Sequence, residues 1–235
     1  MDRSGFSVDP VMAGPEGGGS EPFLEEEIKL QVPNPGVLVA LAGDLSCRGQ
    51  GEWLDRSYQD RYLDHPEWRL LKRRLALRLR RVTGAGAWLE IKGGGQEENG
   101  IWQRPEWRQE AGAGMPACVA DLPDGPVRRG LLGFLTDEDP LRELFTCEMR
   151  RRVLSVLLEE GARVKVSLDQ GVVRAGAVEI GMVEVELEWR AGSREAMRAL
   201  AADLMARYGL LPAKGSRFHA GLALLAPDPA LMARF

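Results

Sequence analysis

The sequence predicts an α+β protein built on an antiparallel sheet or barrel, with about eight strands and three or four helices. Nearly every predicted strand alternates strictly between polar and apolar residues, the period-two pattern of a strand with two different faces. Short turns join consecutive strands, and such connections favour antiparallel neighbours. At 235 residues, 44% of them hydrophobic, the chain is long enough to bury a substantial core.

The strands follow from alternation and from the residues that interrupt it. The first carries Glu25, Glu27 and Lys29 on one face, with Glu26 on the other among apolar residues. Proline ends the second strand, glycines bracket the fourth, and Pro105 suggests an edge or a bulge in the fifth. The expected strands cover residues 25–32, 53–66, 72–82, 84–95, 101–110, 147–158, 162–180 (a hairpin turning at 169–171) and 182–189.

The helices follow from capping signals. A short helix is expected after Pro35, and another over 136–145, where acids fall in the first turn. Residues 110–135 between the strands are expected to form a loop. The clearest helix lies over 193–209, with a serine as N-cap and a glycine as its stop, and a last helix is expected to begin near Lys214.

The polar faces of these strands carry blocks of like charge. Residues i and i+2 lie roughly 7 Å apart on a strand, where two like charges repel by about 0.6 kcal/mol in water and about 2.4 kcal/mol at a dielectric near 20. Glu184, Glu186 and Glu188 form one such block, and arginines form others. The alternative is that these charges lie on an ordinary solvent-exposed face of the sheet. If the strands enclose them instead, carboxylates and basic groups would have to lie close together. Clustered carboxylates beside guanidinium groups suit a divalent metal bound with a polyanion.

Composition excludes several functions. A formal net charge of -4 gives no general reason to expect nucleic-acid binding. No apolar segment approaches membrane-spanning length, and three isolated cysteines indicate a reducing cytoplasm. The run 92–100 lacks the ending of a phosphate-binding Walker loop. His65 and His219 have no triad partners in the sequence, so surface or structural roles are favoured for both.

The ordered motifs resemble the CYTH superfamily, the triphosphate tunnel metalloenzymes. "EEEIKL" matches the family's ExExK signature, and "QDRYLDHP", "LALRLRR", "LEIKG", "QRPEW", "SLDQG", "VEVELEW" and "AKGSRFH" follow in the family's order. "QRPEW" and "SLDQGVVRAG" are most similar to bacterial inorganic triphosphatases. The resemblance implies eight antiparallel strands closed into a charged tunnel, with helices packed outside. Residues 1–21, rich in glycine, proline and serine and without periodicity, are expected to form a flexible tail. The resemblance implies the tunnel domain over 22–226, which leaves a short tail over 227–235.

The resemblance also implies a site. Mg²⁺ or Mn²⁺ would be held by Glu25, Glu27, Glu184 and Glu186, with Glu188 as an outer partner or part of the tunnel rim. Asp169, Lys29 and Arg78 would have catalytic roles, with Asp169 positioning or deprotonating the attacking water. The residues implied to bind the triphosphate are Lys29, Arg78, Arg80, Lys92, Arg104, Arg151, Lys165, Lys214 and Arg217.

Three functions and two departures from the family pattern remain open at this point. Hydrolysis of inorganic triphosphate leads; class IV adenylate cyclase or thiamine triphosphatase activity, and a non-catalytic polyphosphate-binding module, are the alternatives. The expected state is a monomer or homodimer without nucleic-acid or membrane partners. His219 stands where the family has an aromatic residue. Strand parity selects Arg151 and Val153 as inward-facing, where the family often has a second base near Val153. Either one phosphate contact is missing, or Arg150 and Arg152 compensate through a bulge.

Overall fold

The protein is described by a computed structural model that covers residues 22–112 and 114–225. The predicted tails, 1–21 and 227–235, lie outside the described residues. The strands are β1 Phe23–Gln31, β2 Gly49–Asp64, β3 Ala76–Val82, β4 Gly86–Lys92, β5 Gln96–Glu98, β6 Ile101–Glu110, β7 Arg142–Leu157, β8 Arg163–Ala175, β9 Val178–Ala191 and β10 Leu211–Pro212. The helices are α1 Leu38–Arg48, α2 Pro126–Leu132, α3 Arg194–Tyr208 and α4 Arg217–Leu225.

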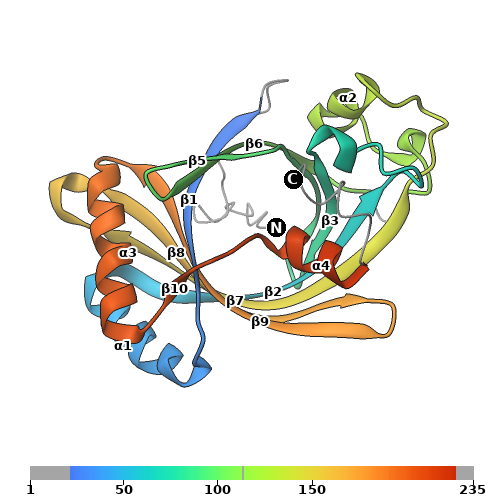
Figure 1. Cartoon of the computed structure of the whole chain (residues 1–235). Helices are drawn as coiled ribbons and strands as arrows, with labels where there is room; N and C mark the ends of the chain where they lie inside the picture. The colour runs from blue at the N-terminus through green and yellow to red at the C-terminus, as the bar shows by residue number, and fades with distance from the viewer. Residues whose placement is uncertain (1–21, 113, 226–235) are drawn as a thin grey trace, which may run out of the picture.

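Eight of these strands close into an antiparallel barrel, which confirms the predicted fold class (Figure 1). The order around the barrel is β1-β9-β8-β7-β2-β3-β4-β6, and pairing of β6 with β1 completes the ring. The short strands β5 and β10 add to β6 and β1. Closure leaves the eight strands without a continuous open edge and gives every strand an inner and an outer face.

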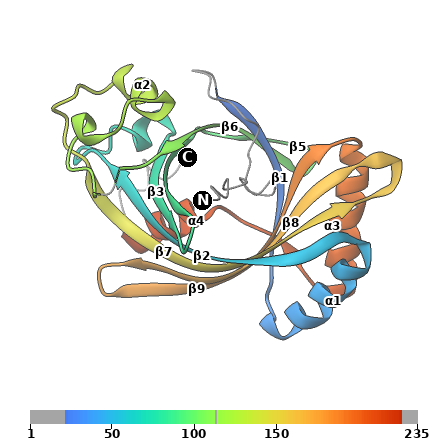
Figure 2. The ribbon, with the colours of Figure 1, turned by 180° about the vertical axis from the view of Figure 1, so that it is seen from behind.

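The apolar faces of the strands point outward, where helices cover them. Helix α1 packs against β2 and β7 and helix α3 against β1 and β9, and Leu45 and Leu204 share one core with Val166 and Leu187. A second cluster lies between α2 and the strands β3 and β4. Figure 2, seen from behind, shows α1 and α3 together at one side of the barrel and α2 at the other. The charged faces are thereby left to the interior.

Helix α4 is placed differently from α1, α2 and α3. Its Phe218 packs against Tyr62 and Phe145, with ring centroids 5.5 and 5.9 Å away. Phe145 is six residues before Arg151 on β7 and so shares its face. Gly221 lies so close to Phe145 that an added Cβ would meet the ring at 2.2 Å. The helix therefore packs on the inward phase of the barrel, with Arg217 at its first position.

The helix predicted over 136–145 is wrong. Residues 136–139 form a turn in which Asp139 Oδ2 accepts a hydrogen bond from the Thr136 N–H at 2.8 Å, and Pro140 bridges to Cys118. Proline has no N–H for a helix, and the chain enters β7 directly afterwards. The helix forms instead inside the expected loop, where α2 begins at Pro126 and Gln109 accepts from the Val127 N–H.

The predicted turn at 169–171 is also wrong, because β8 runs straight through it. Its pairing with β7 and β9 is continuous there, and the hairpin turns at 176–177, where Gly176 has a φ of 59°. Gly171 serves close approach of strands rather than a turn: an added Cβ would lie 1.9 Å from the carbonyl oxygen of Glu148. Residues 72–75, expected within a strand, precede β3, and Arg74 has a φ of 60°.

Pro105 lies inside the barrel wall rather than at its edge. It pairs with Leu24 of β1, and on its other side the carbonyl oxygen accepts from the Gly93 N–H at 2.9 Å. The strand opposite is interrupted by glycines between β4 and β5. An added Cβ at Gly93 would meet the Pro105 ring at 2.6 Å. The missing N–H of the proline is thus accommodated by a break in its neighbour.

The close approach at Gly171 gives a test of this register. We expect Gly171→Ala to lower the free energy of unfolding by about 2 kcal/mol, because β7 and β8 must separate to admit the methyl group. The midpoint of urea denaturation measures this effect. Gly43→Ala is the control, since nothing lies within 4 Å of its added Cβ and alanine favours the helix there. Equal midpoints for the two variants would contradict the register.

Candidate active site

The interior of the barrel contains a cavity with an excess of positive charge. Among the described residues that line it, ten are lysine or arginine and five are glutamate. The basic residues are Lys29, Arg78, Arg80, Lys92, Arg104, Arg108, Arg151, Lys165, Arg190 and Arg217; the acidic residues are Glu25, Glu90, Glu106, Glu186 and Glu188. Strand alternation brings these side chains inward from seven strands, and α4 adds Arg217. A polyanion is the ligand that such a lining favours.

The β1 wall of the cavity is held by alternating signs. Glu25 accepts hydrogen bonds from Lys92 Nζ at 2.6 and 2.8 Å and from Arg104 Nε at 2.7 Å. Burial opposes ionisation of Glu25, but Lys92 and Arg104 outweigh it and hold its pKa well below the usual value. Glu27 accepts from the same arginine, and Lys29 lies 3.7 Å from it. The predicted ligands Glu25 and Glu27 are therefore both bound to Arg104.

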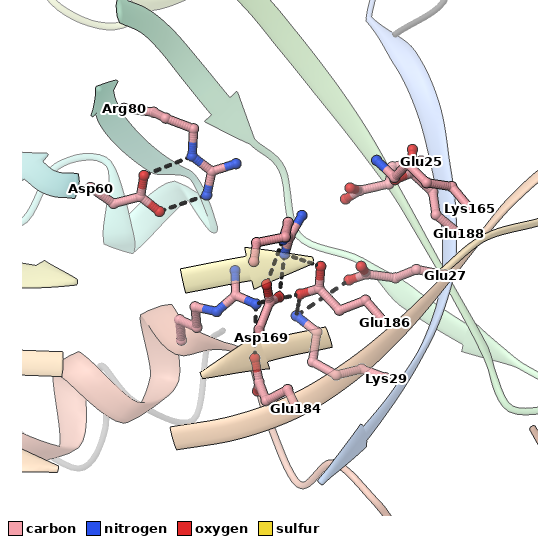
Figure 3. A network of polar contacts seen from close by, with 12 residues as sticks. Glu25, Glu27, Lys29, Asp60, Arg80, Lys165, Asp169, Glu184, Glu186 and Glu188 are labelled. Atoms are coloured by element: carbon pink, nitrogen blue, oxygen red, sulfur yellow. Dashed lines mark hydrogen bonds and ion pairs between the residues drawn. The ribbon is translucent and has the colours of Figure 1, made fainter. Parts of the chain in front are cut away.

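A second acidic cluster lies where β8 and β9 meet α4 (Figure 3). One carboxylate oxygen from each of Asp169, Glu184 and Glu186 lies within 4.8 Å of the others, and all three residues are buried. Arg217 contacts all three acids. Arg151 donates to Asp169 and Glu186. Burial opposes ionisation of Glu186, yet Arg151, Arg217 and Lys29 hold its pKa well below the usual value.

The chemistry of this cluster fits a hard divalent cation. Carboxylate oxygens are the ligands that Mg²⁺ and Mn²⁺ prefer. Glu184 Oε2 is buried and accepts no hydrogen bond, although an Arg217 nitrogen lies 3.0 Å away. An unsatisfied buried carboxylate oxygen aimed at two further carboxylates is a donor set that a cation would complete. Asp169 belongs to this cluster, in addition to the residues predicted as ligands.

The opposite wall contains acids that the sequence analysis did not assign to the site. Asp60 accepts a bidentate pair from Arg80 at 2.7 and 2.6 Å, and Figure 3 shows this pair across the cavity from β1. Glu90 accepts from Arg78 Nε and lies 3.5 Å from Arg108. Glu90 lies two residues before Lys92 on the same face of β4, and Asp60 lies opposite Arg80 of the neighbouring strand. The alternation of side chains along a strand was therefore the sequence signal that could have identified both acids. They orient the guanidinium groups toward the cavity.

Glu106 was also missed, and its charge is only partly compensated. It is buried, and its Oε2 lies 2.8 Å from Lys92 Nζ, which it shares with Glu25. Burial raises the pKa of Glu106 to about 7, and the negative charges of Glu25 and Glu90 add to the effect of burial. Two carboxylates thus compete for one ammonium group.

Most of the residues predicted to bind triphosphate line this one cavity. Arg151 is buried and inward-facing, whereas Arg150 and Arg152 are exposed, so parity rather than a bulge determines this strand. Lys165 pairs with Glu188, which also contacts Arg190 at 2.8 Å. Lys214 is exposed and is not among the residues lining the cavity, so its predicted role stays a prediction.

The two histidines have local structural contacts. Nδ1 of His219 accepts from the Ser216 N–H at 3.2 Å, next to the first residue of α4. Nδ1 of His65 accepts from the Glu67 N–H at 3.0 Å.

None of the helices in the described residues is long and apolar enough to cross a membrane.

Comparison with known proteins points to one family. A model of the CYTH domain family matches residues 24–218. An inorganic triphosphatase from Haemophilus influenzae is 27% identical over 133 residues, which cover 56% of this chain and 36% of that protein. The chain therefore matches about a third of the length of that relative.

Two solved structures share the fold. A Hippeastrum protein, described as an adenylyl cyclase with a dominant triphosphatase activity, has a TM-score of 0.66 at 20% identity and covers 88% of this chain and 98% of its own. A Bacillus halodurans protein assigned as an adenylate cyclase has a TM-score of 0.53 at 17% identity, covering 82% of this chain and 95% of its own. At these identities the likeness is one of fold.

The raised pKa of Glu106 leads to a pH-dependent prediction. The pKa of Glu106 is about 7 in the folded state and 4.5 in the unfolded chain, so the folded state binds the proton more tightly. The contribution of Glu106 to the free energy of unfolding of the wild type therefore falls as the pH rises from 4.5 to 7. Glu106→Gln removes this loss. We expect the free energy of unfolding of the variant, relative to that of the wild type, to increase by about 1–3 kcal/mol between pH 4.5 and pH 8, as measured by urea denaturation. A constant difference across that range would show that Glu106 does not titrate there.

Proposed function

This chain belongs to the CYTH domain family, and we propose that it hydrolyses inorganic triphosphate to pyrophosphate and phosphate inside the barrel. The observation that supports this most directly is the cavity lining, in which ten basic and five acidic described residues surround one space. A buried cluster of three carboxylates lies at its side. A polyanion and a divalent cation together match this distribution of charge.

The arginines would bind the triphosphate by exchanging partners. Arg78 and Arg80 on one wall and Arg151 and Arg217 on the other are each paired with buried carboxylates. Phosphate oxygens accept the same bidentate hydrogen bonds as carboxylates. Arg78, Arg80 and Arg151 would then neutralise the negative charge that develops on the leaving pyrophosphate.

Glu184 and Glu186, with Asp169 beside them, would hold Mg²⁺ or Mn²⁺, and Glu25 and Glu27 of β1 are the further ligands that the family motif implies. When bound, the cation would neutralise phosphate oxygens and compensate the carboxylates that the arginines release. Lys29, 2.9 Å from Glu186, would bridge the two acidic groups. Its pKa is raised, since Glu186, Glu27 and Glu184 outweigh the effect of burial, so it remains positively charged.

Asp169 is our candidate for orienting the attacking water. It lies on β8 as a member of the acidic cluster, and it accepts hydrogen bonds from Arg151 and Arg217. Before the triphosphate binds, two guanidinium groups fix the orientation of its carboxylate. An oriented acceptor beside the phosphate-binding arginines would align a water with the bond to be broken.

Substrate choice is tested by phosphate release from the purified chain. We expect inorganic triphosphate to be hydrolysed faster than ATP or thiamine triphosphate, with Mg²⁺ or Mn²⁺, and EDTA to abolish release. Preference for ATP with formation of pyrophosphate and a cyclic product would favour the cyclase alternative. Tight triphosphate binding without any release would favour a binding module.

Adjacent glutamates on β1 provide a matched pair of variants. Glu27→Gln should lower the rate of phosphate release by about 100-fold or more, since even outer partners of a metal ligand typically cost 10–100-fold. Glu26 points out of the barrel and pairs with Arg194 at 2.5 Å and Gln103 at 2.9 Å. Glu26→Gln should therefore stay within about 3-fold of wild type. Similar losses in both variants would argue against the assignment of the β1 face.

A further inference from the structure

The long strand β9 leaves part of one edge unpaired. It pairs with β8 from Val178 onward, but with β1 only over Glu184 to Glu188. Beyond that, the Val32 N–H donates to the Val183 carbonyl oxygen at 3.0 Å and ends the pairing with β1. Within the described part of the chain, residues 178–182 therefore have a β-strand neighbour on one side only. Figure 1 shows this hairpin of β8 and β9 extending past the barrel wall.

This edge lacks the features that usually prevent strands from associating. Val178 and Ile180 are 53% and 45% exposed, and the run of residues 178–182 contains no proline or lysine. Exposed apolar edge strands pair with other strands unless charge, proline or a covering element blocks them. Glu179, the one charge in the run, is already paired with Arg174 of β8 at 2.7 Å.

The direction of the backbone groups follows from the contact with β1. Because the Val183 carbonyl points toward β1, the N–H and C=O groups of Gly181 and Glu179 point to the same edge. Those of Val178, Ile180 and Met182 point toward β8. The free edge thus presents the backbone groups of two residues on either side of Ile180.

We propose that this edge binds the same edge of a second copy of the chain, antiparallel and about a two-fold axis at Ile180. Glu179 of each copy then lies opposite Gly181 of the other, and each of these pairs exchanges two backbone hydrogen bonds. Ile180 faces its own counterpart as a non-hydrogen-bonded pair, in which side chains approach most closely. The sheet continues from β8 and β9 of one copy into β9 and β8 of the other.

The sequence of the edge is complementary to itself only in this register. Centring the pair on Glu179 would set two glutamates face to face, which is destabilising. Centring it on Gly181 would bring the partner strand against Val183, whose edge β1 already uses. Centring it on Ile180 places Val178 opposite Met182 and Glu179 opposite Gly181. Apolar residues then face each other, and the two glutamates do not.

The surroundings favour a second copy as the occupant. The apolar face of the edge continues an existing core, since Val173 pairs with Ile180 and packs with Phe218 and Leu222 of α4. At the other end of the edge, Pro33 and Met182 border a groove, which the partner's hairpin turn would enter in this register. An isologous contact of this kind closes on itself as a dimer and does not propagate.

A symmetric disulfide tests the register directly. In a Cys47→Ser background, which removes the exposed thiol, Ile180→Cys should form a cross-linked dimer under mild oxidation, because the two Cα atoms would lie about 4.5 Å apart. Val178→Cys is the matched control. Its two copies would be about 13 Å apart along the strands, so it should remain uncrosslinked. Equal cross-linking of both variants, or none, would overturn the proposed pairing.

Solution mass tests the interface without a cross-link. We expect the full chain to sediment as a dimer at micromolar concentration and Ile180→Arg to sediment as a monomer with an unchanged urea midpoint. Val39→Arg, at an 84% exposed position on α1, should remain dimeric. A monomeric wild type, including one whose edge is covered by residues 226–235, would overturn the proposal. Because the edge lies outside the cavity lining, the result does not depend on which triphosphate is hydrolysed.

Discussion

The barrel depends on pairing the basic groups that line its cavity with buried carboxylates. All ten basic residues that line the described cavity lie within ion-pair distance of a carboxylate. An unpaired ion in such an enclosure would cost several kcal/mol, so the two signs must be placed together or not at all. This constraint explains why acids and bases alternate from wall to wall rather than occupying separate halves.

The same constraint connects stability with ligand binding. Carboxylates hold the guanidinium groups in the barrel, as Asp60 holds Arg80 and Asp169 holds Arg151. A phosphate oxygen can replace a carboxylate at an arginine, provided that the released carboxylate finds another cation. Arg217 links this exchange to the C-terminal helix, because it joins α4 to three acids of β8 and β9. Fold and site therefore share one network of ion pairs.

Helix α4 shows how the exterior and interior of the barrel differ. On the outside, α1 and α3 cover aliphatic side chains such as Leu187, as alternation predicts. On the inner face, Phe145 lies on the same side of β7 as Arg151, and Tyr62 lies on the same side of β2 as Asp60. Phe218 of α4 covers both aromatic rings. One part of the interior is thus an apolar core, and the charged cavity lies beside it.

Alternation in the sequence determined which face of each strand is charged, and hence that Arg151 rather than its neighbours points inward. This works because side-chain direction in a strand depends only on residue parity. Local signals failed where partners decide the structure. A run with acids and a proline became a turn and the start of β7, and Gly171, which resembles a turn residue, lies within β8 because β7 approaches it closely. Which carboxylate pairs with which base, including Glu106 with Lys92, was decided only by the tertiary structure. Strand register and barrel closure set the distances between acids and bases on different strands, and the spacing of residues along one strand does not determine either of them.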